Sequence, residues 1–289
     1  MKGVGYYRPR SLEEAWDLQE KIPGARFIAG GTDVMVQLRN QKLPPPALIS
    51  LRSIPELTGV DLGEDGRVTR IGALSTMHDL IGHPGLAENY PVLLAAARRV
   101  GSPQIRHVAT IGGNLCNASP CADTAPSLLV LEARVRLQSA RGSRELRLED
   151  YFVGPGQSRL APDEIFIAVL LDPPARKARA TFLKKGRVTM DLAIASVALR
   201  LEMEGSVCRR ARVAAGSVAP TPLRLTRVEA LLEEGPIDQE VLARAQALAH
   251  DSVSPITDIR STAEYRRQIT GVFVRRAAER LLFHPSGSE

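Results

Sequence analysis

The chain has 289 residues, more than one hydrophobic core usually serves, so two or more packed units are expected. Hydrophobic residues make up 44% and charged residues 24%, as in ordinary globular proteins, and no apolar run approaches the ~20 residues of a membrane span. The net charge of +6 is spread along the chain and aromatic residues are only 4%, which argues against a nucleic-acid surface built on base stacking.

Three scattered cysteines are too few for a disulfide framework and fit a reducing compartment. Residues 1–6 contain no apolar signal core, so we expect a cytoplasmic protein. The densest basic cluster is Arg209, Arg210 and Arg212, which we interpret as a solvated strand edge.

Short strand-like runs alternate with helical stretches in the first two thirds of the chain. Strands are predicted over residues 25–28, 47–51, 67–72, 135–137 and 165–171. Helices are predicted over residues 34–40, 75–81, 91–100 and 123–131, whereas residues 101–114 have the composition of a loop. Ser75 and Asp123 are the expected N-caps of their helices, and Pro91 suits a first helical turn.

A proline-rich, charged segment at residues 172–177 is the best candidate for a linker. We therefore expect one domain over residues 1–174 and a second over 175–289. The second domain opens with two strand-like runs, 193–202 and 207–218, joined by Glu204-Gly205 as in a hairpin. Three helices are predicted to follow, over residues 223–232, 239–251 and 262–283.

Two double-glycine segments carry the strongest chemical signal. They read Ile28-Ala29-Gly30-Gly31-Thr32-Asp33 and Thr110-Ile111-Gly112-Gly113-Asn114. Glycine allows a ligand to approach the main chain closely, and consecutive amides can form a concave nest for an anion. Either segment alone is more simply explained as a tight turn. Both together favour a cofactor with a pyrophosphate, held from two sides.

The familiar nucleotide-binding motifs are missing from the sequence. There is no G-x-G-x-x-G after a strand and no G-x-x-x-x-G-K-[ST]. A dinucleotide must therefore be held by a different kind of fold.

The two glycine segments resemble the two FAD-pyrophosphate loops of the flavoprotein subunits in the xanthine dehydrogenase and carbon monoxide dehydrogenase family. Four more strings resemble that family in the same order along the chain. They are residues 119–123, the segment from Phe182-Leu183-Lys184 to Asp191-Leu192-Ala193, residues 216–222 and residues 258–266. The resemblance covers almost the whole chain.

The resemblance implies an α+β fold. Its first domain would be an FAD-binding domain of the vanillyl-alcohol-oxidase type in two subdomains, with a boundary near residues 53–60. Its second domain would hold a three-stranded antiparallel sheet and a helical bundle. The FAD contacts that the resemblance implies are Ile28, Ala29, Gly30, Gly31, Thr32, Asp33, Val34, Gly101, Thr110, Ile111, Gly112, Gly113, Asn114, Asp123, Phe166 and Lys184.

Some of these residues have implied roles. Val34 would lie near the isoalloxazine, Phe166 would contribute backbone contacts, and Lys184 would stabilise negative charge on the reduced flavin. The alternative for Lys184 is a surface lysine, because Lys185 follows it directly. His107 stands where the family often has asparagine and is given no role.

The remaining cysteines do not support a metal cluster. Three cysteines cannot supply the four thiolates that an iron–sulfur cluster requires, so Cys116 and Cys121 are interpreted as reduced structural thiols. No other metal site is expected.

The implied function is electron transfer through non-covalent FAD. A molybdenum-cofactor subunit would oxidise the substrate, and a small subunit with two [2Fe–2S] clusters would pass electrons to this flavin. The implied assembly is a heterohexamer with two copies of each of three subunits. The alternatives are a free-standing FAD-dependent oxidase or reductase of the same fold and a basic binding module without cofactor. The organic substrate and the final acceptor (NAD, oxygen or quinone) stay open.

Overall fold

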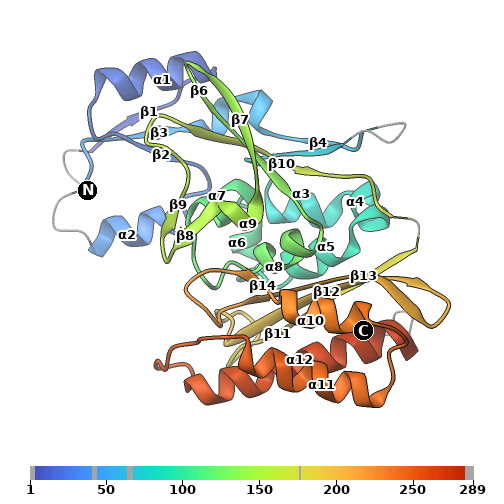
Figure 1. Cartoon of the computed structure of the whole chain (residues 1–289). Helices are drawn as coiled ribbons and strands as arrows, with labels where there is room; N and C mark the ends of the chain where they lie inside the picture. The colour runs from blue at the N-terminus through green and yellow to red at the C-terminus, as the bar shows by residue number, and fades with distance from the viewer. Residues whose placement is uncertain (1–3, 41–43, 64–67, 176, 284–289) are drawn as a thin grey trace.

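The structure is a computed structural model that describes residues 4–40, 44–63, 68–175 and 177–283. In Figure 1 the three-stranded sheet lies at the upper left, the five-stranded sheet runs beside it, and the sheet of β11–β14 lies at the bottom. Helices lie between the sheets and beneath the last one. No helix in the described part of the chain combines the length and apolar character that a membrane span requires.

The first unit is a parallel three-stranded sheet in the order β1 (Gly5–Tyr7), β3 (Ala47–Ser50), β2 (Arg26–Ile28). Helices α1 (Leu12–Lys21) and α2 (Val34–Asn40) cover its two faces (Figure 1). Successive side chains of β3 serve opposite faces, because Ile49 packs with the α1 cluster and Leu48 with the α2 cluster. Two short 3-10 turns, η1 (Leu51–Ser53) and η2 (Pro55–Leu57), lead to the next unit.

The second unit is an antiparallel five-stranded sheet. Its order is β4 (Val60–Asp61), β5 (Thr69–Gly72), β10 (Ile165–Leu171), β6 (Arg134–Ser139) and β7 (Gly142–Arg147). All seven residues of β10 are buried, as suits a strand in the middle of a sheet. A two-stranded ribbon of β8 (Phe152–Gly154) and β9 (Gln157–Ser158) lies beside this unit.

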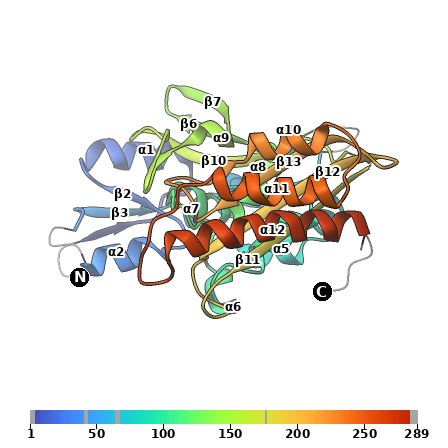
Figure 2. The same cartoon turned by 60° about the horizontal axis from the view of Figure 1, so that its bottom comes forward.

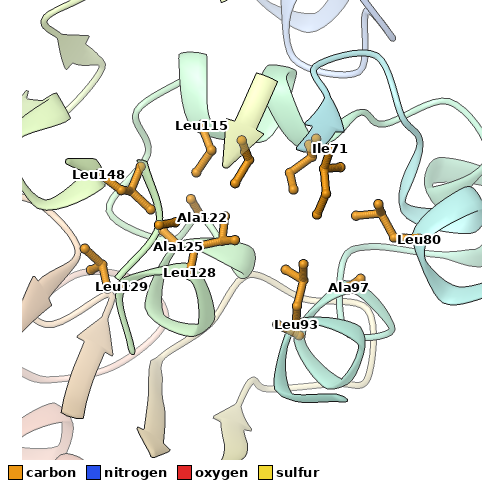
Figure 3. Close-up of a cluster of buried hydrophobic side chains, with 14 of the residues drawn as sticks. Ile71, Leu80, Leu93, Ala97, Leu115, Ala122, Ala125, Leu128, Leu129 and Leu148 are labelled. Atoms are coloured by element: carbon orange, nitrogen blue, oxygen red, sulfur yellow. The ribbon is translucent and has the colours of Figure 1, made fainter. Parts of the chain in front are cut away.

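Among the described residues, seven helices belong to this unit. They are α3 (Met77–Gly82), α4 (Pro84–Asn89), α5 (Pro91–Ala97), α6 (Pro103–Arg106), α7 (Ile111–Cys116), α8 (Thr124–Val130) and α9 (Leu148–Tyr151). Figure 3 shows the core that they form with the sheet, where Ile71, Leu93 and Leu128 point toward one another from β5, α5 and α8. All three side chains are fully buried.

The last unit is an antiparallel sheet in the order β11 (Ala178–Lys185), β12 (Ala195–Glu204), β13 (Val207–Gly216), β14 (Leu223–Arg224). The β12–β13 turn is at Gly205, whose φ of +61° suits glycine. Helices α10 (Thr226–Glu233), α11 (Gln239–Asp251) and α12 (Ala263–Phe283) lie side by side on one face (Figure 2).

The other face of this sheet packs against the second unit. Helix α5 contacts β11, and α8 contacts β12 and β13. Phe182, Ala198 and Ala214 accordingly belong to the apolar cluster of the second unit rather than to that of α10–α12. One sheet thus serves two hydrophobic cores.

The predicted α+β class and the predicted hairpin are confirmed, and three local predictions are wrong. Helix α3 is capped by Thr76 rather than Ser75, because Thr76 and Asp79 form a reciprocal capping box. Residues 101–114 are not all loop, since α6 and the start of α7 lie there. Leu223 is not helical, because β14 adds a short fourth strand beside the three expected ones.

The predicted solvated strand edge is only partly right for the basic cluster of β13. Strand β14 pairs only with Ala214 and Ala215, so it does not cover the cluster, and Arg209 is exposed, but Arg210 and Arg212 both pair with the Glu132 carboxylate. Glu132 follows α8 with a left-handed φ of +53°, a conformation that non-glycine residues rarely adopt. Arg200 and Arg224 also lie within 4.0 Å of this carboxylate, so one side chain of the second unit faces four guanidinium groups of the last unit.

Candidate cofactor site

The first glycine segment forms an open turn between β2 and α2. Gly31 has a φ of +78°, and a Cβ atom on Gly30 would lie only 1.9 Å from the Val108 carbonyl oxygen. Both positions therefore require glycine. In the described part of the chain, none of the amides of residues 30–33 donates to a backbone carbonyl. These donors are available to a ligand.

The second glycine segment differs from the predicted loop, because it is the first turn of α7. Thr110 is its N-cap, and its side-chain oxygen accepts from the Gly113 amide at 3.1 Å. The amides of Ile111, Gly112 and Asn114 donate to Ser75, Ala73 and Thr110 carbonyls. The prediction that these amides form an anion nest is therefore wrong for this segment. The amides are already bonded to the Thr110 cap and to carbonyls elsewhere in the chain.

Gly112 and Gly113 have different surroundings. A Cβ atom on Gly112 would lie 2.8 Å from both the Cβ and the carbonyl oxygen of Ala73, so the backbones are in close contact there. A Cβ atom on Gly113 would meet only the Thr110 hydroxyl, at 2.9 Å, and otherwise open space. Gly112 is thus required by packing, whereas Gly113 leaves room for something outside the helix.

The fold brings the predicted site segments together. Gly30 lies against Val108 at the approach to α7, and Gly112 lies against Ala73 after β5. The Ala73 amide donates to the Ile167 carbonyl at 2.9 Å, next to Phe166 in β10. The Phe166 ring itself is turned into the core against Tyr151, so only its main chain can serve a ligand.

A buried ion pair lies at the N-cap position of α8 and links two units. The Lys184 ammonium of β11 donates to Asp123 Oδ2 at 2.7 Å and to the Arg99 carbonyl at 2.9 Å, two residues before Gly101. Only 1% of the Lys184 side chain and 7% of the Asp123 side chain are exposed. Lys185, by contrast, is exposed, so the two neighbouring lysines have different environments.

Asp123 occupies the N-cap position of α8 but makes no capping bond, because its carboxylate is turned to Lys184. Burial raises the pKa of this carboxyl to about 6, against the opposing effects of Lys184 and Arg99. Its other oxygen, Oδ1, is buried and has no hydrogen-bond partner in the described part of the chain. The neighbouring Thr124 hydroxyl donates to the Asn114 side chain at 2.6 Å, which ties this region to the second glycine segment.

The remaining predicted residues lie around the same segments. Ile28 ends β2, Ala29 to Asp33 form the first turn, and Val34 begins α2. Gly101 has a φ of +45°, and its carbonyl accepts from the Arg106 guanidinium at 3.1 Å. The predicted contacts therefore follow one path from the first unit through the second and onto β11.

Sequence reasoning missed a charged network beside this path. Asp258 pairs with Arg260 and with the fully buried Arg266. The Arg260 guanidinium lies 3.6 Å from Cys121 Sγ. Residues 258–266 matched a family string, but nothing in that string indicated which partners its arginines would find.

The two cysteines of the site region have separate environments. Burial raises the pKa of the Cys116 thiol to about 11, and the Tyr151 hydroxyl donates to its sulfur at 3.5 Å. Cys121 Sγ lies 3.8 Å from the Ala193 carbonyl. Among the described residues, no group of three or more metal-ligating His, Cys, Asp or Glu side chains comes together.

Comparison with known proteins identifies the family. Residues 2–173 match the model of the FAD binding domain in molybdopterin dehydrogenase, and residues 180–281 match that of the CO dehydrogenase flavoprotein C-terminal domain. The chain belongs to this FAD-binding subunit family. Its members act as oxidoreductase subunits.

Relatives of this flavoprotein chain match over nearly its whole length. The carbon monoxide dehydrogenase medium chain of Afipia carboxidovorans is 34% identical, over 95% of each chain. A putative xanthine dehydrogenase FAD-binding subunit of Escherichia coli is 32% identical, over 91% of this chain and 90% of that one. The structure of CO dehydrogenase from Oligotropha carboxidovorans superimposes with a TM-score of 0.91 at 33% identity and 96% coverage of both chains. That of quinoline 2-oxidoreductase from Pseudomonas putida gives 0.90 at 27% identity, again over 96% of both.

The residues of this flavoprotein chain fit an FAD molecule. FAD carries a pyrophosphate, and the first glycine segment offers amides that no backbone carbonyl of the described residues uses. The open side of Gly113 gives room for close approach, and Asp123 Oδ1 is a buried acceptor without a partner among the described residues. An unpartnered buried polar atom of this kind normally implies a missing partner.

Proposed function

We propose that this chain holds one FAD non-covalently between the two glycine segments and the Asp123–Lys184 pair. The observation that carries the proposal is the convergence of these segments, since Gly30 packs on the approach to α7 and Asn114 bonds beside Asp123. The proposed contacts are residues 28–34, Gly101, residues 110–114, Asp123, Phe166 and Lys184. No histidine or cysteine lies in either glycine segment, which argues against a covalent tether.

Each group has a definite task in this proposal. The amides of residues 30–33 donate to the pyrophosphate, while Gly113 allows it to approach the main chain. Phe166 contributes through its backbone, and Val34 lies toward the ring system. FAD, when bound, supplies chemistry that accepts electrons singly and delivers them singly or in pairs. Lys184, held by Asp123, places a fixed positive charge at the site.

We further propose that electrons reach this site from another polypeptide. Two [2Fe–2S] clusters would need about eight thiolates, roughly four for each, and the chain has three cysteines. Relatives carry the names of medium chains and FAD subunits of carbon monoxide, glyceraldehyde and nicotinate dehydrogenases. The proposed assembly is a dimer of heterotrimers with a small iron–sulfur subunit and a large molybdenum-cofactor subunit. This chain then relays electrons to an external acceptor, and the large subunit selects the organic substrate.

Acid denaturation tests the cofactor assignment. The supernatant should contain FAD in about one equivalent per chain, because only a dinucleotide supplies the pyrophosphate that both glycine segments flank. FMN in the supernatant, or flavin retained in the pellet, would contradict the proposal.

Stopped-flow absorbance tests the relay. The isolated chain should not show flavin bleaching with purines, aldehydes, aromatic heterocycles or carbon monoxide. Co-expression with the partner subunits should make bleaching depend on substrate. Rapid substrate-driven bleaching in the isolated chain would instead make it a complete enzyme.

A further inference from the structure

Arg266 is a charged residue in the buried interior of the last unit. It lies on α12, only 2% of it is exposed, and one of its nitrogens, Nε, is buried without a hydrogen-bond partner in the described part of the chain. Asp258 accepts from its Nη2 at 2.8 Å and keeps the charge paired. Burying an arginine costs desolvation energy unless its charge is paired and its N–H groups are bonded. The bonds that its third nitrogen, Nη1, makes to main-chain carbonyls therefore indicate why it is buried.

The Nη1 atom of Arg266 donates to two carbonyls, those of Ile194 at 2.7 Å and Ser217 at 3.1 Å. These residues lie just before β12 and just after β13, at the same end of the sheet as Lys184. The register pairs Lys184 with Ser196 and Ser196 with Gly216. The Arg266 guanidinium therefore bonds to two main-chain carbonyls at the end of the sheet where Lys184 lies.

Two chains of hydrogen bonds lead from those carbonyls to the ion pair. The Ile194 amide donates to the Lys185 carbonyl at 2.7 Å, directly beside Lys184. The Ser217 amide donates to the Pro120 carbonyl at 2.7 Å, three residues before Asp123. Through Ile194 and Ser217, Arg266 is thus connected to Lys185, the neighbour of Lys184, and to Pro120, three residues before Asp123.

Ser217 adds an independent sign of constraint. Its φ is +67°, in the left-handed region that favours glycine, and its hydroxyl is buried without a partner among the described residues. Such strain persists only where the surroundings fix the residue, and it gathers at ligand sites. Here Pro120 holds the amide and Arg266 holds the carbonyl.

We infer that Arg266 is a positioning residue of the FAD site, which sets the geometry of the Asp123–Lys184 pair from a different domain without touching the cofactor. This inference rests on the proposed function. Asp258 acts with Arg266, because it accepts from Arg266 and from Arg260, which reaches Cys121 two residues before Asp123.

A double-mutant cycle on FAD affinity tests the inference, with flavin fluorescence as the readout on the full chain. Arg266→Met should weaken FAD binding by about tenfold in the natural background but by less than about twofold in the Asp123→Asn background, because coupled residues are not additive. Val274→Ala is the matched control, since Val274 is fully buried on the same helix in the core of the last unit. Its effect on affinity should be small and equal in both backgrounds.

The possible outcomes are distinct. An equal loss of affinity from Arg266→Met in both backgrounds, or no loss in either, would overturn the positioning role. Failure of the unmodified chain to bind FAD would instead remove the proposed function. Circular dichroism of each variant establishes folding. If Arg266→Met does not fold, Arg266→Lys takes its place in the same cycle, because an ammonium cannot reproduce the two-nitrogen fork that reaches Asp258 and both carbonyls.

Discussion

Burial of the Asp123 carboxyl disfavours its charged form relative to its protonated form. Its pKa of about 6 in the folded chain lies above the value of about 3.9 expected for the unfolded chain. The folded chain therefore binds this proton more tightly. The stabilisation that protonation gives is complete below the unfolded pKa and is lost as the pH rises through the folded one.

We predict that the Asp123→Asn substitution removes this pH dependence from the apo chain. Between about pH 4 and pH 7, the free energy of unfolding of the unmodified chain should fall relative to that of the variant by up to about 3 kcal/mol. Urea denaturation at a series of pH values measures the difference. Asp163→Asn is the matched control, because Asp163 lies in an exposed ion pair with Arg141. Parallel curves for Asp123→Asn and the unmodified chain would contradict the prediction.

The first turn of α7 allows cofactor binding to be separated from folding. Gly113 lies three residues after the Thr110 N-cap, so Gly113→Asp would complete a T-x-x-D capping box and place an acid in the first helical turn. The Thr110 hydroxyl, 2.9 Å from the new Cβ, must shift slightly, so we predict an apo melting temperature that changes little. FAD binding should be lost, because the new carboxylate would oppose the pyrophosphate. Thermal melts and flavin content measure the two effects.

The neighbouring glycine is the control for this experiment. Gly112→Ala should lower the melting temperature, since its Cβ would lie 2.8 Å from the Ala73 carbonyl oxygen. A Gly113→Asp chain that keeps normal flavin content would show that this turn of α7 has only a structural role.

Local patterns predicted most elements, and the failures have physical reasons. Helix α2 matches residues 34–40, and the Glu204-Gly205 hairpin forms with Gly205 in its turn. The second glycine segment was misread because two adjacent glycines disfavour a helix. Thr110 capping and bonds to Ala73 and Ser75, distant in sequence, overcome that preference.

The same limit applies to the candidate site. Family strings indicated Asp123 and Lys184, but their mutual contact depends on how β11 docks on the second unit, which no local pattern specifies. The carbonyls that accept from Arg266 could not be predicted either, because they too depend on how distant segments pack. The individual FAD contacts and the domain division at residue 174 stay predictions.

At the scale of the whole molecule, Glu132 is a charged link between the second and last units. It faces Arg200, Arg210, Arg212 and Arg224 from a left-handed backbone conformation. We predict that Glu132→Gln lowers the free energy of unfolding by about 1–3 kcal/mol at low salt. This loss is smaller than that expected for breaking a fully buried ion pair, because solvent reaches the cluster. Urea denaturation should show a smaller difference at 1 M NaCl, as screening weakens the attraction.

The variant Glu132→Gly separates backbone strain from charge. Glycine tolerates the left-handed conformation, so this variant should regain about 1 kcal/mol relative to Glu132→Gln. If the Glu132→Gln variant is as stable as the unmodified chain at low salt, the ion pairs between Glu132 and the four arginines do not stabilise the fold.

The sheet that serves two cores has a consequence for how such chains can be cut and recombined. A main-chain break between β10 and β11 would yield two fragments, one exposing the apolar surface of α5 and α8 and the other exposing Phe182, Ala198 and Ala214. Each fragment would be prone to aggregate alone and complementary to the other, so mixing them should restore the native structure. The two family-matched segments therefore depend on each other to bury this apolar surface. A chimaera that takes one of them from a relative must inherit both sides of this contact.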